Sequence, residues 1–416
     1  MNQNNHLDAL LALRGFACLM VVIHHCTPPR NSLIYHGYDF SWLIFSYGWV
    51  AVWIFFVLSG YLMGKAFYLE RYTDDVPGTI NFWRNRIFRI VPLYYFAVLI
   101  LTLFVYPNWL KIENWGYLLR VFTFSYDFSI NYQTGMNFNG VFWSLSTEVQ
   151  FYFLVPFIFS YFQQRFTSRK KVYFVGLLIF FIIFIIRCIF WFAFRKEIGE
   201  QITYVVKYWY TPIITNLDLF VGGFIVNIWF KYQNSKSQFT LYHLVYKNLH
   251  LYKLNKKYIA TTLIILLYLF TAHHAYSQEL FNLPEQAGKG IRTITTFFIL
   301  PPLTALITSF FIWAFESDIY YSTNKNQKLS FSTILKNPLR ILEIFGNLSY
   351  GVYIWHVPII EKITPIFTAS IPIEAFYSKL TATVILSTIL ATVTYYLVEL
   401  PFAKWKLYQQ TSKLEN

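Results

Sequence analysis

Residues 42–66 read WLIFSYGWVAVWIFFVLSGYLMGKA, and this stretch decides the fold class. It carries a single charged side chain, Lys65, close to its end. Crossing a hydrocarbon layer about 30 Å thick takes about 20 helical residues with few charges. We therefore predict that residues 42–66 form a membrane-spanning helix.

The same pattern recurs along the whole chain. Apolar runs of sufficient length lie roughly at 8–29, 42–66, 87–106, 141–163, 172–194, 208–230, 258–276, 291–315, 341–364 and 377–402. The composition agrees, because 56% hydrophobic and 13% charged residues are typical of a chain dissolved largely in lipid and not of a soluble globule. The sequence predicts an all-α, polytopic membrane protein with about ten transmembrane helices.

The basic residues indicate the topology and not a polyanionic ligand. The formal net charge is +14, yet Lys and Arg sit in short loops between apolar runs and form no basic face, so we predict no nucleic-acid partner. Most of the 34 Lys and Arg fall on one side if the N-terminus is cytoplasmic, and the positive-inside rule then places both termini in the cytoplasm. We expect a multi-pass protein of the cell (inner) membrane, in contact with membrane lipid.

Three further stretches bear on the organisation. The acid-free, lysine-rich loop 231–257 is expected either to lie against anionic lipid or to be a solvated linker. The polar stretch 107–140 contains a short apolar piece, WGYLLRVFTFSY, which we expect at the outer surface, where it would help to bind an acceptor. The three cysteines have no metal-binding spacing, so no metal site is predicted.

The first run, LDALLALRGFACLMVVIHH (residues 7–25), contains Arg14, His24 and His25, and ionisable groups inside a membrane are candidate functional residues. Eleven positions separate Arg14 from His25, so at about 100° per residue they share a helical face, about 16 Å apart along the axis. His24 points about 80° away and is the weaker candidate. The alternative for Arg14 is that it snorkels to the inner interface.

A second cluster opens the third run, where NFWRNRIFRIVPLYY brings Arg84, Arg86 and Arg89 to the cytoplasmic side. Arg86 and Arg89 are three positions apart and nearly aligned on a helix. Guanidinium groups match phosphate oxygens in bidentate geometry, which favours a phosphate clamp. The alternative is that these arginines only set the topology.

Two later runs carry further candidates. Glu148 follows WSLST in a strongly apolar setting, where a carboxylate must be neutral or paired, so it is either functional or a structural hydrogen-bond partner. Ser349, Tyr353 and His356 are four and three positions apart on one helical face. Glu399, near the end of the last run, is expected to pair with one of the inner arginines.

Several motifs occur in the order typical of a known family. They are the Arg-x10-His of Arg14 and His25, FFVLSGYLM, the Arg-x-x-Arg of Arg86 and Arg89, WSLSTE, LSYGVYIWHVP and YYLVELPFAKW. Together they resemble the acyltransferase 3 family of integral-membrane O-acyltransferases, over nearly the whole chain. The chain departs from the common pattern at Thr147, where an acid or a small apolar residue is more usual.

The resemblance implies about ten spans and an acyl-CoA donor, usually acetyl-CoA. It implies as acceptor a glycan or lipid-linked sugar, such as lipopolysaccharide O-antigen or exopolysaccharide. Many members carry a fused extracytoplasmic SGNH hydrolase-like domain. Here we expect one transmembrane domain over residues 1–416 and no such addition.

In the mechanism expected from these features, Arg14, Arg86 and Arg89 bind the donor from the cytoplasm. His25 takes the proton from an acceptor hydroxyl, because a neutral imidazole is a competent base near neutral pH. We predict that Glu148 orients that imidazole.

Ser146, Tyr353 and His356 are the candidates for contacting substrate or for donating a hydrogen bond to the oxyanion. An acyl-histidine intermediate is the alternative chemistry.

Two other function classes compete with the acyltransferase. A transporter of a small solute or lipid-linked glycan would use buried Arg, His and Glu as pathway residues, although the sequence has no inverted repeat. A non-catalytic membrane scaffold would leave the aligned Arg14 and His25 without a role.

Overall fold

The computed structural model describes residues 7–126, 138–166, 168–200, 206–234, 249–277, 295–317 and 330–411. Within these ranges the regular secondary structure is helical apart from one two-stranded sheet, which confirms the all-α prediction. Parts of the predicted lysine-rich loop 231–257 and of the outer stretch 107–140 lie outside the described residues.

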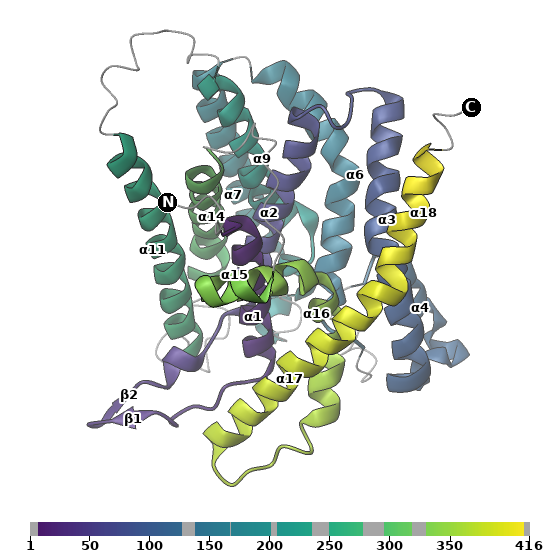
Figure 1. Cartoon of the computed structure of the whole chain (residues 1–416), viewed down its shortest axis with the longest axis vertical. Helices are drawn as coiled ribbons and strands as arrows, with labels where there is room; N and C mark the ends of the chain where they lie inside the picture. The colour runs from purple at the N-terminus through teal and green to yellow at the C-terminus, as the bar shows by residue number, and fades with distance from the viewer. Residues whose placement is uncertain are drawn as a thin grey trace.

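The ten predicted runs all correspond to long helices (Figure 1). These are α1 (Ala9–His25), α2 (Gly48–Tyr68), α3 (Val76–Ile100), α6 (Phe142–Arg165), α7 (Arg169–Glu200), α9 (Ile213–Asn234), α11 (Leu249–Tyr276), α14 (Leu300–Glu316), α16 (Ile341–Ile363) and α17 (Pro372–Thr394), which α18 (Leu400–Thr411) extends; the short helices are α4 (Trp115–Phe122) and α15 (Phe331–Lys336). Seven candidate spans in the described ranges are long and apolar enough to cross a membrane. Helices α1, α6 and α16, which carry the buried polar residues described below, are not among those seven.

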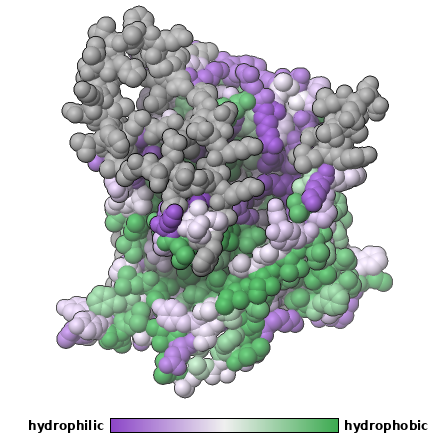
Figure 2. All heavy atoms as spheres, viewed as in Figure 1, coloured by the Kyte–Doolittle hydropathy of each residue, from purple (hydrophilic) through white to green (hydrophobic). Residues whose placement is uncertain are grey.

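The surface agrees with a bundle embedded in lipid. In Figure 2 hydrophobic residues gather over α17 and the lower part of the view, while hydrophilic residues gather toward its upper end. Helix α7 presents large apolar side chains outward, such as Phe174, Leu177 and Phe192, and only 17% of its most apolar window is buried in the protein. Lipid chains, and not water, are the natural neighbours of such a face. The protein is a multi-pass membrane protein.

Helix α3 begins earlier than the predicted residue 87. Its N-cap is Asp75, whose side chain accepts a hydrogen bond from Gly78 N at 2.7 Å, and Pro77 occupies the first turn. Both features favour a helix start, because the first turn has N–H groups without intrahelical partners. Arg86 and Arg89 therefore lie within the helix and not at its first turn.

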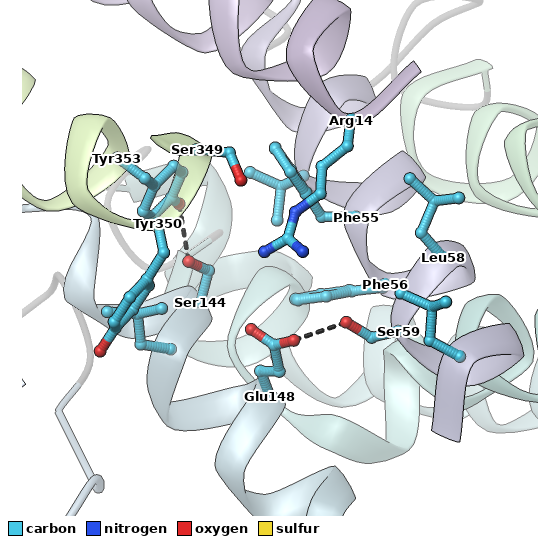
Figure 3. Close-up of a pocket in the computed structure, with 13 residues that line it drawn as sticks. Arg14, Phe55, Phe56, Leu58, Ser59, Ser144, Glu148, Ser349, Tyr350 and Tyr353 are labelled. Carbon is cyan, nitrogen blue, oxygen red and sulfur yellow. Dashed lines mark hydrogen bonds between the residues drawn. The ribbon is translucent and has the colours of Figure 1, made fainter. Parts of the chain in front are cut away.

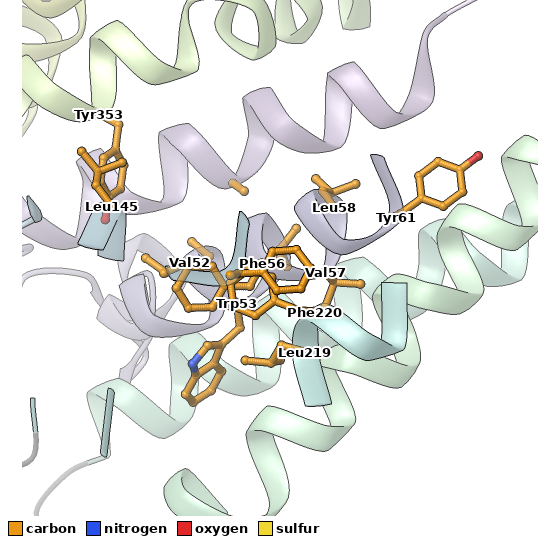
Figure 4. Packing of buried hydrophobic residues seen from close by; sticks show 14 of the residues in the cluster. Val52, Trp53, Phe56, Val57, Leu58, Tyr61, Leu145, Leu219, Phe220 and Tyr353 are labelled. Carbon is orange, nitrogen blue, oxygen red and sulfur yellow. The ribbon is translucent and has the colours of Figure 1, made fainter. Parts of the chain in front are cut away.

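Helices α2 and α9 cross closely in the core. A Cβ on Gly60 would lie 1.9 Å from the carbonyl oxygen of Phe220, and a Cβ on Gly223 would lie 1.9 Å from that of Val57. Only glycine permits these approaches. Packing of this kind, with apolar rings such as Phe56 filling the space around the crossing (Figure 4), is the usual means of associating helices in a membrane.

Helices α1 and α16 cross in the same way. A Cβ on Gly15 would lie 1.9 Å from the carbonyl oxygen of Leu342, and a Cβ on Gly346 would lie 2.1 Å from that of Leu11. The reciprocal glycines fix the distance between the two helices. This distance matters below, because each helix contributes a histidine to the candidate site.

A buried ion pair joins α7 to α9. Arg187 Nη1 and Nη2 donate to the two carboxylate oxygens of Asp218 at 2.6 and 2.7 Å, and the residues are 2% and 1% exposed. The guanidinium also donates to the carbonyl oxygen of Thr215. Bidentate pairing satisfies both charges where no water is available.

The connection from α1 to α2 contains the antiparallel strands β1 (Ile34–Tyr35) and β2 (Tyr38–Asp39). Asp39 accepts hydrogen bonds from the Ser41 hydroxyl at 2.6 Å and from the Tyr276 hydroxyl. Desolvation opposes the charged form, but these hydrogen bonds outweigh it and hold the pKa of Asp39 below its usual value. The contact ties the hairpin to the end of α11.

Candidate active site

A cavity of about 60 Å³ lies among α1, α2, α6 and α16 (Figure 3). It is lined by Arg14, Val52, Phe55, Phe56, Leu58, Ser59, Leu62, Ser144, Leu145, Glu148, Ser349, Tyr350 and Tyr353. Four of the candidates named from the sequence, Arg14, Glu148, Ser349 and Tyr353, therefore come together. A cavity of this volume accommodates a group of a few atoms among mixed polar and apolar walls.

Glu148 and Arg14 both point into this cavity (Figure 3). The Glu148 carboxylate accepts hydrogen bonds from the Ser59 hydroxyl on α2, at 2.5 Å, and from the Tyr152 hydroxyl one turn further along α6. The Nε atom of Arg14 is buried and has no hydrogen-bond partner among the described residues. A guanidinium nitrogen left in this state is a candidate donor to a bound ligand.

Ser144, and not the predicted Ser146, faces the cavity. The Ser146 hydroxyl donates back to the Phe142 carbonyl of its own helix, at 3.2 Å, whereas Ser144 Oγ lies 2.6 Å from the Tyr353 hydroxyl. Two positions on a helix correspond to about 200°, so the two serines point to opposite sides. The structure therefore brings Ser144, and not Ser146, to this cavity.

The hydroxyl proton of Tyr353 is used in its hydrogen bond to Ser144. Ser144 Oγ donates to the Val141 carbonyl at 3.0 Å, which leaves it to accept from Tyr353. An oxyanion role for Tyr353 would therefore require its hydroxyl to leave Ser144.

His25 meets a second histidine at the end of α1. His25 Nδ1 lies 3.1 Å from Nε2 of His356 on α16 and 3.0 Å from the Val21 carbonyl oxygen. The rings are 5.0 Å apart between centroids. His24 points elsewhere, to the Ser46 carbonyl oxygen at 3.1 Å. The imidazole of His25 therefore contacts His356, whereas the hydrogen bonds of Glu148 go to Ser59 and Tyr152 and not to His25.

The arginines of α3 differ among themselves. Arg84 Nη2 donates to Asn81 Oδ1 at 2.9 Å, whereas the buried Nε atom of Arg86 has no hydrogen-bond partner among the described residues. Arg89 is exposed as a whole residue, and its guanidinium lies within electrostatic range of Arg14, Arg86 and Glu399. Glu399 thus lies within electrostatic range of Arg89 and Arg14, and its pairing with one of them stays a prediction.

Polar groups connect this cluster to the histidines. Tyr152 lies within electrostatic range of Arg86 and donates a hydrogen bond to Glu148 in the cavity. On the opposite wall, the ring of Tyr353 is 5.7 Å from that of His356. The arrangement forms a series of polar side chains from α3 through the cavity to the end of α1.

A family model, Acyl_transf_3, described as an acyltransferase domain, matches residues 7–396. The chain belongs to the acyltransferase 3 family. The match includes every predicted site residue of this family member and both histidines of the contacting pair.

Curated relatives of this acyltransferase-family chain are O-acetyltransferases by name. The O-acetyltransferase OatA of Staphylococcus aureus is 23% identical, over 97% of this chain and 58% of its own length. The putative peptidoglycan O-acetyltransferase YrhL of Bacillus subtilis is also 23% identical, over 96% of this chain and 55% of its own length. The chain thus spans less than two thirds of these relatives. No solved structure matches it.

Several contacts in this acyltransferase-family site were not predicted. Tyr152 follows Glu148 by four positions, a spacing that places both on one helical face and could have indicated the hydrogen bond. Ser59 lies within the quoted FFVLSGYLM motif, but nothing local indicates its partner. Among the described residues, no cluster of three or more His, Cys, Asp or Glu could hold a metal ion.

Proposed function

We propose that the chain is a membrane O-acetyltransferase that moves an acetyl group from acetyl-CoA to a hydroxyl of a cell-surface glycan. The proposal rests on one observation above all. Two buried guanidinium nitrogens, Arg14 Nε and Arg86 Nε, have no hydrogen-bond partner among the described residues, and they lie along the polar series that leads to His25. Family membership and the names of the relatives supply the reaction class.

The donor would enter from the side where α3 begins. Arg86 and Arg89 would bind phosphates of the coenzyme, and Arg14 would contact the donor further in, because guanidinium groups form charge-assisted bonds to phosphate and carbonyl oxygens. By its position on α1, Arg14 is about 16 Å along the helix axis from His25. A donor with an extended pantetheine arm can span a path of this length, whereas a compact donor would not require one.

His25 would act as the general base. Its Nε2 takes the proton of the acceptor hydroxyl as that oxygen forms a bond to the thioester carbonyl carbon. The carbon–sulfur bond breaks, and the departing thiolate takes the proton from Nε2, which leaves an acetyl ester and free coenzyme A. His25 is only half-buried, so an acceptor has access to it.

Glu148 would act within the cavity and not on His25. Its carboxylate holds Ser59 and Tyr152 and faces the same space as Arg14. A carboxylate beside the guanidinium lowers the energetic cost of keeping Arg14 in the membrane interior, and it orients that side chain toward the donor.

The acceptor we propose is a sugar hydroxyl. The printed name of YrhL refers to peptidoglycan, so a peptidoglycan sugar joins lipopolysaccharide O-antigen and exopolysaccharide among the acceptors to test. Comparing glycan masses from cells with and without the chain identifies the acceptor, because transfer adds the mass of an acetyl group to one of these glycans.

The direct test uses purified protein in detergent with acetyl-CoA labelled in the acetyl group. We expect release of the coenzyme thiol and transfer of label to a soluble glycan acceptor, both lost in His25→Ala. Folded protein that neither binds nor consumes acetyl-CoA would overturn the proposal.

A further inference from the structure

His356 occupies a position that its sequence neighbours do not explain. It is fully buried on α16, in the interior of the bundle, and both of its ring nitrogens are engaged. Nδ1 lies 3.1 Å from the Val352 carbonyl oxygen, and Nε2 lies 3.1 Å from His25 Nδ1. A packing histidine needs no partner of this kind on another helix.

The partners determine which nitrogen carries each proton. A carbonyl oxygen only accepts, so His356 Nδ1 must be the protonated nitrogen that donates to Val352. In the neutral ring, Nε2 of His356 is then an acceptor, and His25 Nδ1 must donate to it. The Val21 carbonyl oxygen, 3.0 Å from the same nitrogen, requires the same assignment. The lone pair of His25 therefore resides on Nε2, for which the described residues provide no hydrogen-bond partner.

We infer that His356 is the positioning residue of the proposed transfer reaction, holding His25 in the tautomer and orientation that make Nε2 the base. The inference rests on the proposed function. As Nε2 of His25 gains a proton, the bond from Nδ1 to His356 stabilises the imidazolium that forms. In serine hydrolases a carboxylate plays this role of orienting the imidazole and stabilising the imidazolium.

A neutral hydrogen-bond acceptor for His25 suits the membrane interior better than a carboxylate does. A charge inside the membrane is costly, whereas two neutral imidazoles carry no charge between turnovers. The other titratable rings near the pair are His24, 5.3 Å from His25, and Tyr353, 5.7 Å from His356. His24 is bonded to Ser46 and Tyr353 pairs with Ser144, so neither replaces His356.

The test compares amides of two lengths at position 356. In His356→Gln the side-chain oxygen reaches the place of Nε2 and keeps an acceptor for His25, whereas in His356→Asn the shorter amide reaches only the place of Nδ1. We expect His356→Gln to retain most of the activity. His356→Asn and His356→Leu should lose roughly a hundredfold in kcat with an unchanged KM for acetyl-CoA. His274→Leu, which removes another buried histidine bonded to Thr296, is the matched control and should keep normal kcat per folded protein.

Equal kcat in the wild type and in a folded Asn or Leu variant would overturn the inference, and so would equal losses in Gln and Asn. If neither His356→Asn nor His356→Leu folds, His356→Gln decides the inference. A folded but inactive His356→Gln variant overturns it, and an active one supports it. The proposed function is judged separately by the wild type and His25→Ala. A wild type that does not transfer acetyl refutes both proposals, whereas an active wild type leaves the position 356 series to decide the inference alone.

Discussion

Gly346→Ala should separate the two helices that carry the histidines. The new Cβ would lie 2.1 Å from the carbonyl oxygen of Leu11, and ordinary contact begins at 3.4 Å, so α1 and α16 must part by up to the difference of 1.3 Å. The obstacle is backbone, which cannot rotate away as a side chain can. The His25–His356 distance of 3.1 Å would then exceed hydrogen-bonding range if only about half an ångström of this separation reached it.

We expect two effects of Gly346→Ala. Overpacking lowers the free energy of unfolding by about 1 to 3 kcal/mol, partly offset by the higher helix propensity of alanine, about 1 kcal/mol. Acetyl transfer per mole of folded protein falls by more than about tenfold, because the base loses the partner that orients it.

The assay measures thermal unfolding in detergent and acetyl transfer normalised to the monodisperse fraction from size exclusion. Gly176→Ala on α7 is the matched control, since its Cβ would meet Ile225 at an ordinary 3.4 Å. It should be neutral or slightly stabilising. Wild-type turnover in folded Gly346→Ala would show that the helix spacing does not control the histidine pair, and the reasoning from the crossing to the site would fail.

Further predictions concern the base, the donor site and the topology. His25→Ala should lower transfer about a hundred- to ten-thousandfold while His24→Ala retains it, and equal losses would mean that the wrong histidine was chosen. Arg86→Ala should weaken donor binding by roughly 1.5 to 3 kcal/mol, and Arg89→Ala should weaken it less because Arg89 is exposed. Lysine at position 86 should restore part of the affinity. Unchanged donor affinity in both alanine variants would mean that these arginines only set the topology. Single cysteines in 231–257 should be protected from an impermeant label in intact cells, and labelling from outside would contradict the cytoplasmic assignment.

The helices could be predicted because each apolar run carries its own information. Length and composition decide whether a segment spans a membrane, and they placed the helices within a few residues of their observed positions. The starts of α11 and α14 differ more, at residues 249 and 300 against the predicted 258 and 291, and so does the start of α3. There Asp75 and Pro77 begin the helix well before its apolar part, so capping, and not hydrophobicity, determines the boundary.

Within the site, relations along one helix were predictable and relations between helices were not. The 3.6-residue period correctly grouped Ser349, Tyr353 and His356 on one face of α16. The partner of His25, in contrast, is 331 positions away, and no local pattern indicates which helices become neighbours. That Ser144 and not Ser146 faces the cavity could not be predicted either, because its contact is with Tyr353 on another helix.

Arg187 and Asp218 constrain how the nascent chain enters the bilayer. Helix α7 leaves the ribosome first, and a guanidinium near the middle of a lone span costs about 2.5 to 3.5 kcal/mol during insertion, with a similar cost for an aspartate. The bidentate contact between the two side chains removes both costs once α9 arrives. Helices α7 and α9 are therefore expected to pass from the translocon into lipid as a pair, with α7 held at its lateral gate until its counter-charge has been synthesised.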